Sequence, residues 1–336
     1  MSTIFRVVKL TRFTGFSNSA YAIRNSQLKT RLVPARNVTS RSRVSTLKRA
    51  VRRTKIASEE SAFASSGKYG LLAVAGASAA GIGALCYYGL GLSNQIGAID
   101  KMAIWPQYVR DRIKASYGHL MVGLGVTAAS AASLYRTRFA YKFMTANPLL
   151  AIGGSLAAMI GTAYICQSMP YQEGLLNTKH LAWLVHTGTI GFVLSPLMFM
   201  GGPLLMRAAA ITGGVVGGLS MIAACAPSEK FLTWGGPLGL ALGGVCMASI
   251  GSAFIPATGM LGAGLYSISL YGGLLVFGGL LLYDTQKLVK KAETHSLYHP
   301  VKYDPINESI GVYMDIINIF IRIATILAAG GGSRRR

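Results

Sequence analysis

Long apolar segments separated by short polar ones dominate the sequence. A helix needs about 20 mostly apolar residues to cross the hydrocarbon core of a bilayer. Eight segments of that kind, bounded by charged residues, Pro or Asn, predict eight transmembrane helices: Tyr69–Leu92, Gly118–Leu134, Leu149–Cys166, Leu181–Met200, Ala208–Cys225, Gly235–Ile255, Gly259–Tyr283 and Ile306–Ala328. The connections are too short to hold a soluble domain. We therefore expect an all-α polytopic membrane protein.

The longest polar stretch between these segments divides them unequally. Residues 93–117 separate the first segment from the other seven and contain several charged side chains. We interpret 93–117 as a polar linker that joins an additional N-terminal transmembrane helix, 69–92, to a seven-helix membrane core, 118–329. A basic tail, 330–336, follows the core.

Composition supports a membrane protein and also indicates a cellular location. Of 336 residues, 51% are hydrophobic and 13% charged, which excludes a soluble globular enzyme. The net charge is +22, and residues 1–58 alone carry 14 Lys and Arg with no Asp or Glu. A basic, Ser-rich, acid-free leader is typical of a mitochondrial transit peptide. The alternative is a basic tail that binds anionic lipid or nucleic acid. Nucleic acid is not an expected partner, because the rest of the chain lacks basic-aromatic patches.

The basic residues also suggest an orientation. Eight spans place both termini on the same side of the membrane, and the charged ends favour the mitochondrial matrix for both. The connections 93–117 and 284–305 are basic as well and would face the opposite side, so they oppose this orientation.

Motifs for metal, cofactor or covalent chemistry are absent from the sequence. The four cysteines form no Cys-x-x-Cys pair, and the five histidines are scattered. There is no phosphate loop, nucleophile elbow or His-Glu-x-x-His motif. We therefore expect neither an enzyme nor a bound cofactor.

Carboxylates at membrane depth are the strongest functional candidates, because burying them is costly. In the last apolar segment, Glu308, Asp315 and Arg322 recur every seven residues and so lie near one helix face, with Asn318 leaning the same way. Seven residues span about 10 Å, which is too far for direct pairing along the helix. Asp315 therefore needs a partner from another helix, and the best candidate is Asp284, at the end of the preceding segment.

Two adjacent carboxylates cannot both be charged at low cost, so the pair would hold a shared proton until a cation displaces it. Carboxylate oxygens suit hard cations such as Ca²⁺, which compete with protons. The pattern therefore favours a proton-coupled cation site. The structural alternative is that Asp284 caps a helix end and that Asp315 pairs with Arg322 or an Asn.

Three stretches carry a family resemblance: LLYDTQKLVKKAE, YDPINESIGVYMDIINIFIRIATIL and APSEKFLTWGGPLG. From about Val109 to the end, the chain resembles the transmembrane Bax-inhibitor-motif family, and its leader and extra first span resemble the mitochondrial member of that family. The resemblance implies a seven-helix Bax-inhibitor-motif bundle. It also implies that Asp284 and Asp315 form a di-aspartyl Ca²⁺ and H⁺ site.

The resemblance further implies a multi-pass protein of the cardiolipin-rich mitochondrial inner membrane that exchanges or leaks Ca²⁺ against H⁺. Cristae organisation, retention of cytochrome c and contact with an inner-membrane AAA protease are implied in the same way. Some bacterial relatives latch the site with an Arg, for which Arg322 is the candidate here, whereas Glu308 is a peripheral ligand or an exposed residue. The alternative function is a non-transporting scaffold that maintains cristae and regulates the protease.

Overall fold

A computed structural model describes residues 104–137, 147–172, 177–226, 229–255 and 259–331, together with residues 141, 145 and 174. All regular elements in these ranges are helices, without a strand among them. The predicted leader 1–58, the predicted first span 69–92 and most of the basic tail lie outside the described residues.

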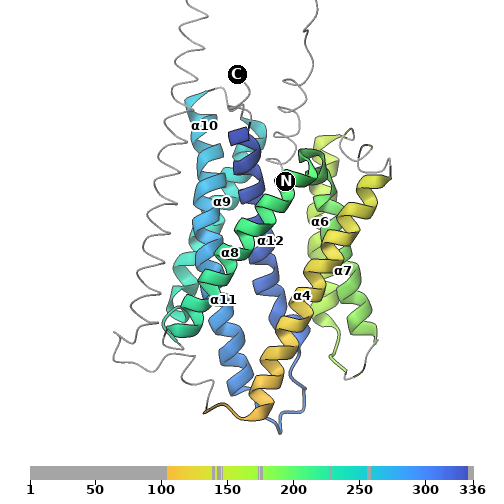
Figure 1. The fold of residues 1–336 in the computed structure, drawn as a ribbon, viewed down its shortest axis with the longest axis vertical. Helices are drawn as coiled ribbons and strands as arrows, with labels where there is room; N and C mark the ends of the chain where they lie inside the picture. Colours follow the sequence, from red (N-terminus) through yellow and green to blue (C-terminus); the bar gives the residue numbers. More distant parts are fainter. Residues whose placement is uncertain are drawn as a thin grey trace, which may run out of the picture.

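The helices follow one another with short connections (Figure 1). In chain order they are α4 (Gln107–Arg136), α6 (Pro148–Ser168), α7 (Thr178–Leu194) with a 3₁₀ turn (Ser195–Met200), α8 (Gly202–Cys225), a 3₁₀ turn (Leu232–Trp234), α9 (Gly235–Phe254), α10 (Met260–Ser267), a π-helical turn (Ile268–Gly272), α11 (Gly273–Thr294) and α12 (Pro305–Gly331).

Six helical segments of the described chain are long and apolar enough to cross a membrane: Leu150–Ser168, Thr178–Met200, Gly202–Ala224, Leu232–Phe254, Met260–Thr294 and Pro305–Gly330. Each overlaps one of the predicted segments, so the all-helical, multi-pass architecture is confirmed. The predicted segment 118–134 lies within α4, which is not among the six. The expected total of eight spans stays a prediction.

Two predicted boundaries differ from the structure. Residues 107–117, predicted as part of a linker, already form the start of α4. The segment predicted to end at Tyr283 continues as helix to Thr294, because the polar residues that follow Tyr283 bind other parts of the protein from within α11. Local hydropathy marks where the apolar stretch ends, whereas the helix ends where its tertiary contacts end.

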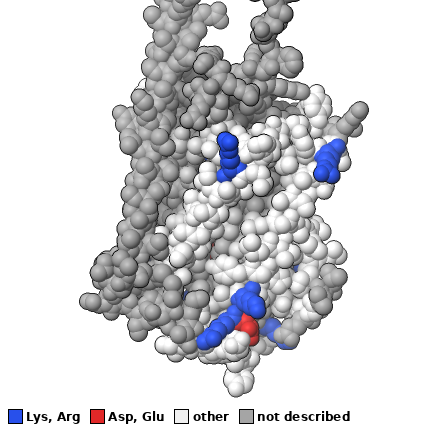
Figure 2. Space-filling view, viewed as in Figure 1, with Lys and Arg blue, Asp and Glu red and all other residues white. Residues whose placement is uncertain are grey.

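Helix α12 runs through the middle of the bundle and packs against α11, α4 and α8 (Figure 1). Its Ile306, Ile319 and Ala324 are completely buried. On the outer helix α9, by contrast, Leu240 is 82% exposed and Met247 is 70% exposed. Large apolar side chains in such positions need lipid around them. Figure 2 shows the corresponding uncharged belt, with Lys and Arg toward the two ends of the visible face.

The start of α12 is encoded locally. Asp304 accepts hydrogen bonds from the backbone N–H groups of Ile306 and Asn307 through Oδ1, both at 3.0 Å. Pro305 follows as the first helical residue, where its missing N–H costs nothing. The Asp-Pro pair therefore sets where α12 begins, and through it the height of every residue on the helix.

Candidate functional site

Two carboxyl groups meet where α11 packs on α12. Asp284 lies on α11 and Asp315 on α12, and their carboxyl groups lie close enough to interact. Asp315 is 4% exposed, and its Oδ2 atom is buried without a hydrogen-bond partner. Two neighbouring buried carboxyl groups favour holding a proton, because two negative charges close together in a buried site would repel strongly. The pair can therefore hold one proton and still offer a free carboxylate oxygen.

A glycine makes this contact sterically possible. Gly311 lies one helical turn before Asp315, on the same face of α12. A Cβ atom at Gly311 would lie 2.6 Å from Oδ2 of Asp284, which is closer than real Cβ contacts allow. The missing side chain therefore gives the Asp284 carboxyl its place against the α12 backbone. Sequence reasoning did not identify Gly311, since glycine is common throughout these helices.

The rotation of α11 is set on its other side by Gln286. Gln286 Oε1 accepts a hydrogen bond from the backbone N–H of Phe231 at 2.8 Å, and its Nε2 donates to the Ala223 carbonyl at 3.3 Å. Two residues turn a helix by about 200°. Anchoring Gln286 to α8 and to the segment that follows it therefore turns Asp284 toward α12. Asp284 lies well inside α11 and does not cap a helix end.

Charged residues surround the carboxyl pair on the side of the α11–α12 connection. Lys291 and Glu308 form an ion pair with a separation of 2.8 Å between Nζ and Oε1. Among the described residues, Lys287, Lys291 and Glu308 also lie close enough for their charges to act on Asp284. Glu308, expected as a peripheral ligand or an exposed residue, is thus an ion-paired neighbour of the site.

Arg322 binds within its own helix. Its Nη1 donates to the backbone carbonyl and to Oδ1 of Asn318, both at 3.0 Å, and its guanidinium lies 4.4 Å from the ring centre of Phe277. Asn318 in turn donates through Nδ2 to the carbonyl of Met314. The alternative in which Asp315 pairs with Arg322 is therefore wrong: the guanidinium of Arg322 binds Asn318 and packs on Phe277, and it forms no ion pair with Asp315. Its assignment as a latch stays a prediction.

A second buried charge on α7 escaped sequence reasoning. Lys179 has a completely buried ammonium group, which forms an ion pair with Asp304 Oδ2 at 2.8 Å. It also donates to Asn307 Oδ1 at 2.8 Å and to the Met169 carbonyl at 3.0 Å. All three N–H donors are used, so Lys179 fastens the start of α7 to the start of α12. The Thr-Lys-His sequence at 178–180 contains no signal of this role.

Polar contacts also join the end of α11 to α4. Arg112 donates to the carbonyls of Ala292 and His295 through Nη1, at 3.0 and 2.8 Å, and lies over the ring of Tyr303. Burial raises the pKa of the Tyr303 hydroxyl to about 12, and this hydroxyl hydrogen-bonds to Ser116 at 3.1 Å. Tyr303 therefore stays neutral over the physiological pH range and belongs to the framework.

A sequence profile of the family described as "Inhibitor of apoptosis-promoting Bax1" matches residues 109–332. The chain belongs to this family. The expected family and the residue where the resemblance begins are thereby confirmed. Asp284, Gly311, Asp315 and the Lys179–Asp304 ion pair all lie within the matched part.

Individual relatives agree with the family. The chain is 53% identical over 262 residues to growth hormone-inducible transmembrane protein of Rattus norvegicus, covering 78% of this chain and 75% of that protein. It is 37% identical over 92 residues to Bax inhibitor 1 of the same species, a match that covers 26% of this chain and 36% of that protein. It is 25% identical over 223 residues to inner membrane protein YbhL of Escherichia coli (strain K12), covering 65% and 90%. No solved structure matches the chain.

Proposed function

We propose that this protein is a proton-coupled cation transporter that carries Ca²⁺ as substrate through a site built from Asp284 and Asp315. The supporting observation is the contact between two carboxyl groups inside membrane-spanning helices, one of them with an unpartnered buried oxygen. A structural role offers no reason for this arrangement, because burying like charges together is costly.

The chemistry of the exchange follows from the two protonation states. With one proton, the pair carries a single negative charge and is closed by its own hydrogen bond. Loss of that proton leaves oxygen ligands of the hard type that Ca²⁺ prefers, and cation binding then replaces proton binding. Protons and cations therefore compete, so that a proton gradient drives cation movement in either an exchanger or a proton-gated leak.

The proposed location is the mitochondrial inner membrane, with both termini in the matrix. The acid-free basic leader at 1–58 supports a mitochondrial address. Both statements are tested by protease protection of the two termini, measured in intact mitoplasts and in inverted vesicles of the inner membrane. Cleavage of both termini only in inverted vesicles is the expected result, and cleavage in intact mitoplasts contradicts the orientation.

The transport proposal is tested by reconstituting the purified full chain into liposomes that contain a Ca²⁺ dye, under an imposed pH gradient. We expect gradient-dependent Ca²⁺ flux that is lost in Asp284→Asn and in Asp315→Asn. Asp111→Asn is the matched control, because Asp111 is exposed on α4. Reconstituted amount and helical content are compared for all four proteins.

The outcomes separate transport from the alternative function. Loss of flux in both site variants with full flux in the control supports the carboxyl pair as the cation site. Absence of flux in the wild-type protein, or flux unchanged by both substitutions, contradicts transport through this pair and favours the non-transporting scaffold.

A further inference from the structure

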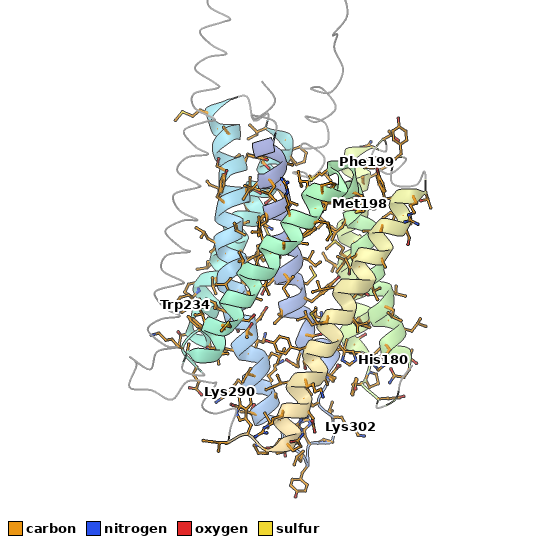
Figure 3. The ribbon with its side chains drawn as sticks, viewed as in Figure 1. His180, Met198, Phe199, Trp234, Lys290 and Lys302 are labelled. Carbon is orange, nitrogen blue, oxygen red and sulfur yellow. The ribbon has the colours of Figure 1, made fainter. Side chains whose placement is uncertain are left out.

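Two histidines far apart in the sequence meet between α4 and α7. The Nε2 atoms of His119 and His180 lie 3.3 Å apart, although 61 residues separate them in the chain. Both side chains are half-buried, and the rings of His119 and Trp183 pack nearly perpendicular to each other, with centres 5.6 Å apart. Figure 3 shows His180 at the lower end of α7, the same end as Lys290 and Lys302.

The other nitrogen of His119 identifies its tautomer. His119 Nδ1 lies 2.8 Å from the backbone carbonyl of Ala115. A carbonyl oxygen can only accept a hydrogen bond, so Nδ1 carries the hydrogen. In a neutral ring the remaining nitrogen, Nε2, then carries a lone pair.

The same reasoning applies to His180. Its Nδ1 lies 2.7 Å from Oδ1 of Asn177. That atom is identified as oxygen because it also accepts from the backbone N–H of His180 at 3.1 Å, while Asn177 Nδ2 donates to the Gln172 carbonyl. Nδ1 of His180 therefore carries the hydrogen, and its Nε2 also presents a lone pair.

Two lone pairs that face each other at 3.3 Å repel unless a positive species lies between them. Two histidine nitrogens bound to one tetrahedral Zn²⁺ at about 2.0–2.1 Å are separated by about 3.3 Å. Histidines that bind metals usually donate their other N–H to a carbonyl or carboxylate oxygen, which orients the ring. Both rings of this pair meet that condition.

We propose that His119 and His180 form a binding site for a transition-metal ion of the Zn²⁺ class that joins α4 to α7. Imidazole nitrogens suit Zn²⁺, Cu²⁺, Ni²⁺ and Co²⁺, whereas Ca²⁺ prefers oxygen, so this site is chemically distinct from the carboxyl pair. Within the described ranges no cluster of three or more His, Cys, Asp or Glu residues forms a metal site. Water fills the remaining coordination positions of the half-exposed pair. The inference does not depend on transport.

The loop after α11 supplies a matched control. The rings of His295 and His299 are also close, with centres 5.2 Å apart. One nitrogen of each ring is engaged at Val301, however: His295 Nε2 lies 2.9 Å from the Val301 carbonyl, and His299 Nδ1 lies 3.1 Å from both the carbonyl and the backbone N–H of Val301. Removing His299 leaves the proposed site intact.

The first experiment measures Zn²⁺ binding to the tag-free full chain in detergent near neutral pH, using a chromogenic competitor. We expect one equivalent to bind the wild-type protein and the Kd to rise at least about tenfold in His119→Ala and in His180→Ala, but not in His299→Ala. An unchanged Kd in either site variant, or no binding to the wild-type protein, overturns the proposal. In the latter case the pair holds a shared proton instead.

A second measurement needs no substitution in the site, so its result does not depend on whether His119→Ala and His180→Ala fold. Cu²⁺ bound to the wild-type protein is examined by electron paramagnetic resonance, in which nitrogen hyperfine splitting counts the bound imidazoles. A spectrum with two equivalent nitrogens that persists in His299→Ala supports the site. A spectrum with oxygen ligands only, or with one nitrogen, overturns it.

Discussion

Two clusters of charged groups that involve the α12 region differ in how their charges are compensated. At the start of the helix, Lys179 and Asp304 pair opposite charges, and every donor of the ammonium group has a partner. Further along, Asp284 and Asp315 place like groups together and leave Asp315 Oδ2 unpartnered. A closed network stabilises one arrangement of the helices, whereas an open like-charge pair weakens the fold and marks a functional site.

The largest effect is expected from a substitution that disrupts the hydrogen-bonded network around Lys179. Lys179→Met keeps the length of the apolar stem but leaves the partly buried Asp304 carboxylate without its cation and Asn307 and the Met169 carbonyl without their donor, so the free energy of unfolding should fall by about 3–5 kcal/mol. Denaturant titration of the protein in mixed micelles measures the loss. Lys114→Met is the control, because Lys114 is exposed on α4 and should change little. A loss equal to that of the control contradicts the structural role of the ion pair.

A smaller effect is expected at Gly311, where the Asp284 carboxyl packs against the backbone of α12. Gly311→Ala places a Cβ against the Asp284 carboxyl, so it should destabilise the protein by about 1–2 kcal/mol, despite the higher helix propensity of Ala. It should also reduce Ca²⁺ flux in liposomes although both aspartates remain. The control is Gly330→Ala on the same helix, where no atom lies within 4 Å of the added Cβ. Equal stability and flux in the two variants would contradict the close contact.

The smallest change in stability is expected for Asp315→Asn, and comparing it with Asp304→Asn tests the difference between the two clusters. Asp315→Asn replaces the shared proton by an amide that can donate to Asp284, so the free energy of unfolding should stay within about 0.5 kcal/mol or rise. Asp304→Asn should lower it instead, because it removes the partner of the buried Lys179. Unfolding of both variants is measured in the same micelles. A greater loss in Asp315→Asn than in Asp304→Asn would reverse the comparison.

Glycine shows how far sequence reasoning reaches. Many glycines lie inside the helices, and pairs such as Gly213 and Gly217 have the four-residue spacing that often permits close helix packing. In the part of the chain that the structure describes, an added Cβ at either position would meet no atom within 4 Å. Close approaches occur instead at glycines such as Gly191, Gly279 and Gly311, none of which has a glycine four residues away. What a glycine does depends on the atom opposite, and the local sequence does not contain it.

The sequence by itself determined the multi-pass helical class, the start of α12 and the two carboxylates most worth examining. Hydropathy, helix capping and the cost of buried charge are local properties, so they are visible in the chain. Only the tertiary structure decided that Asp284 lies inside α11 with Gly311 beside it, that Lys179 binds Asp304, and that His119 meets His180. These contacts join different helices, and their geometry follows from the rotation and height at which the helices pack.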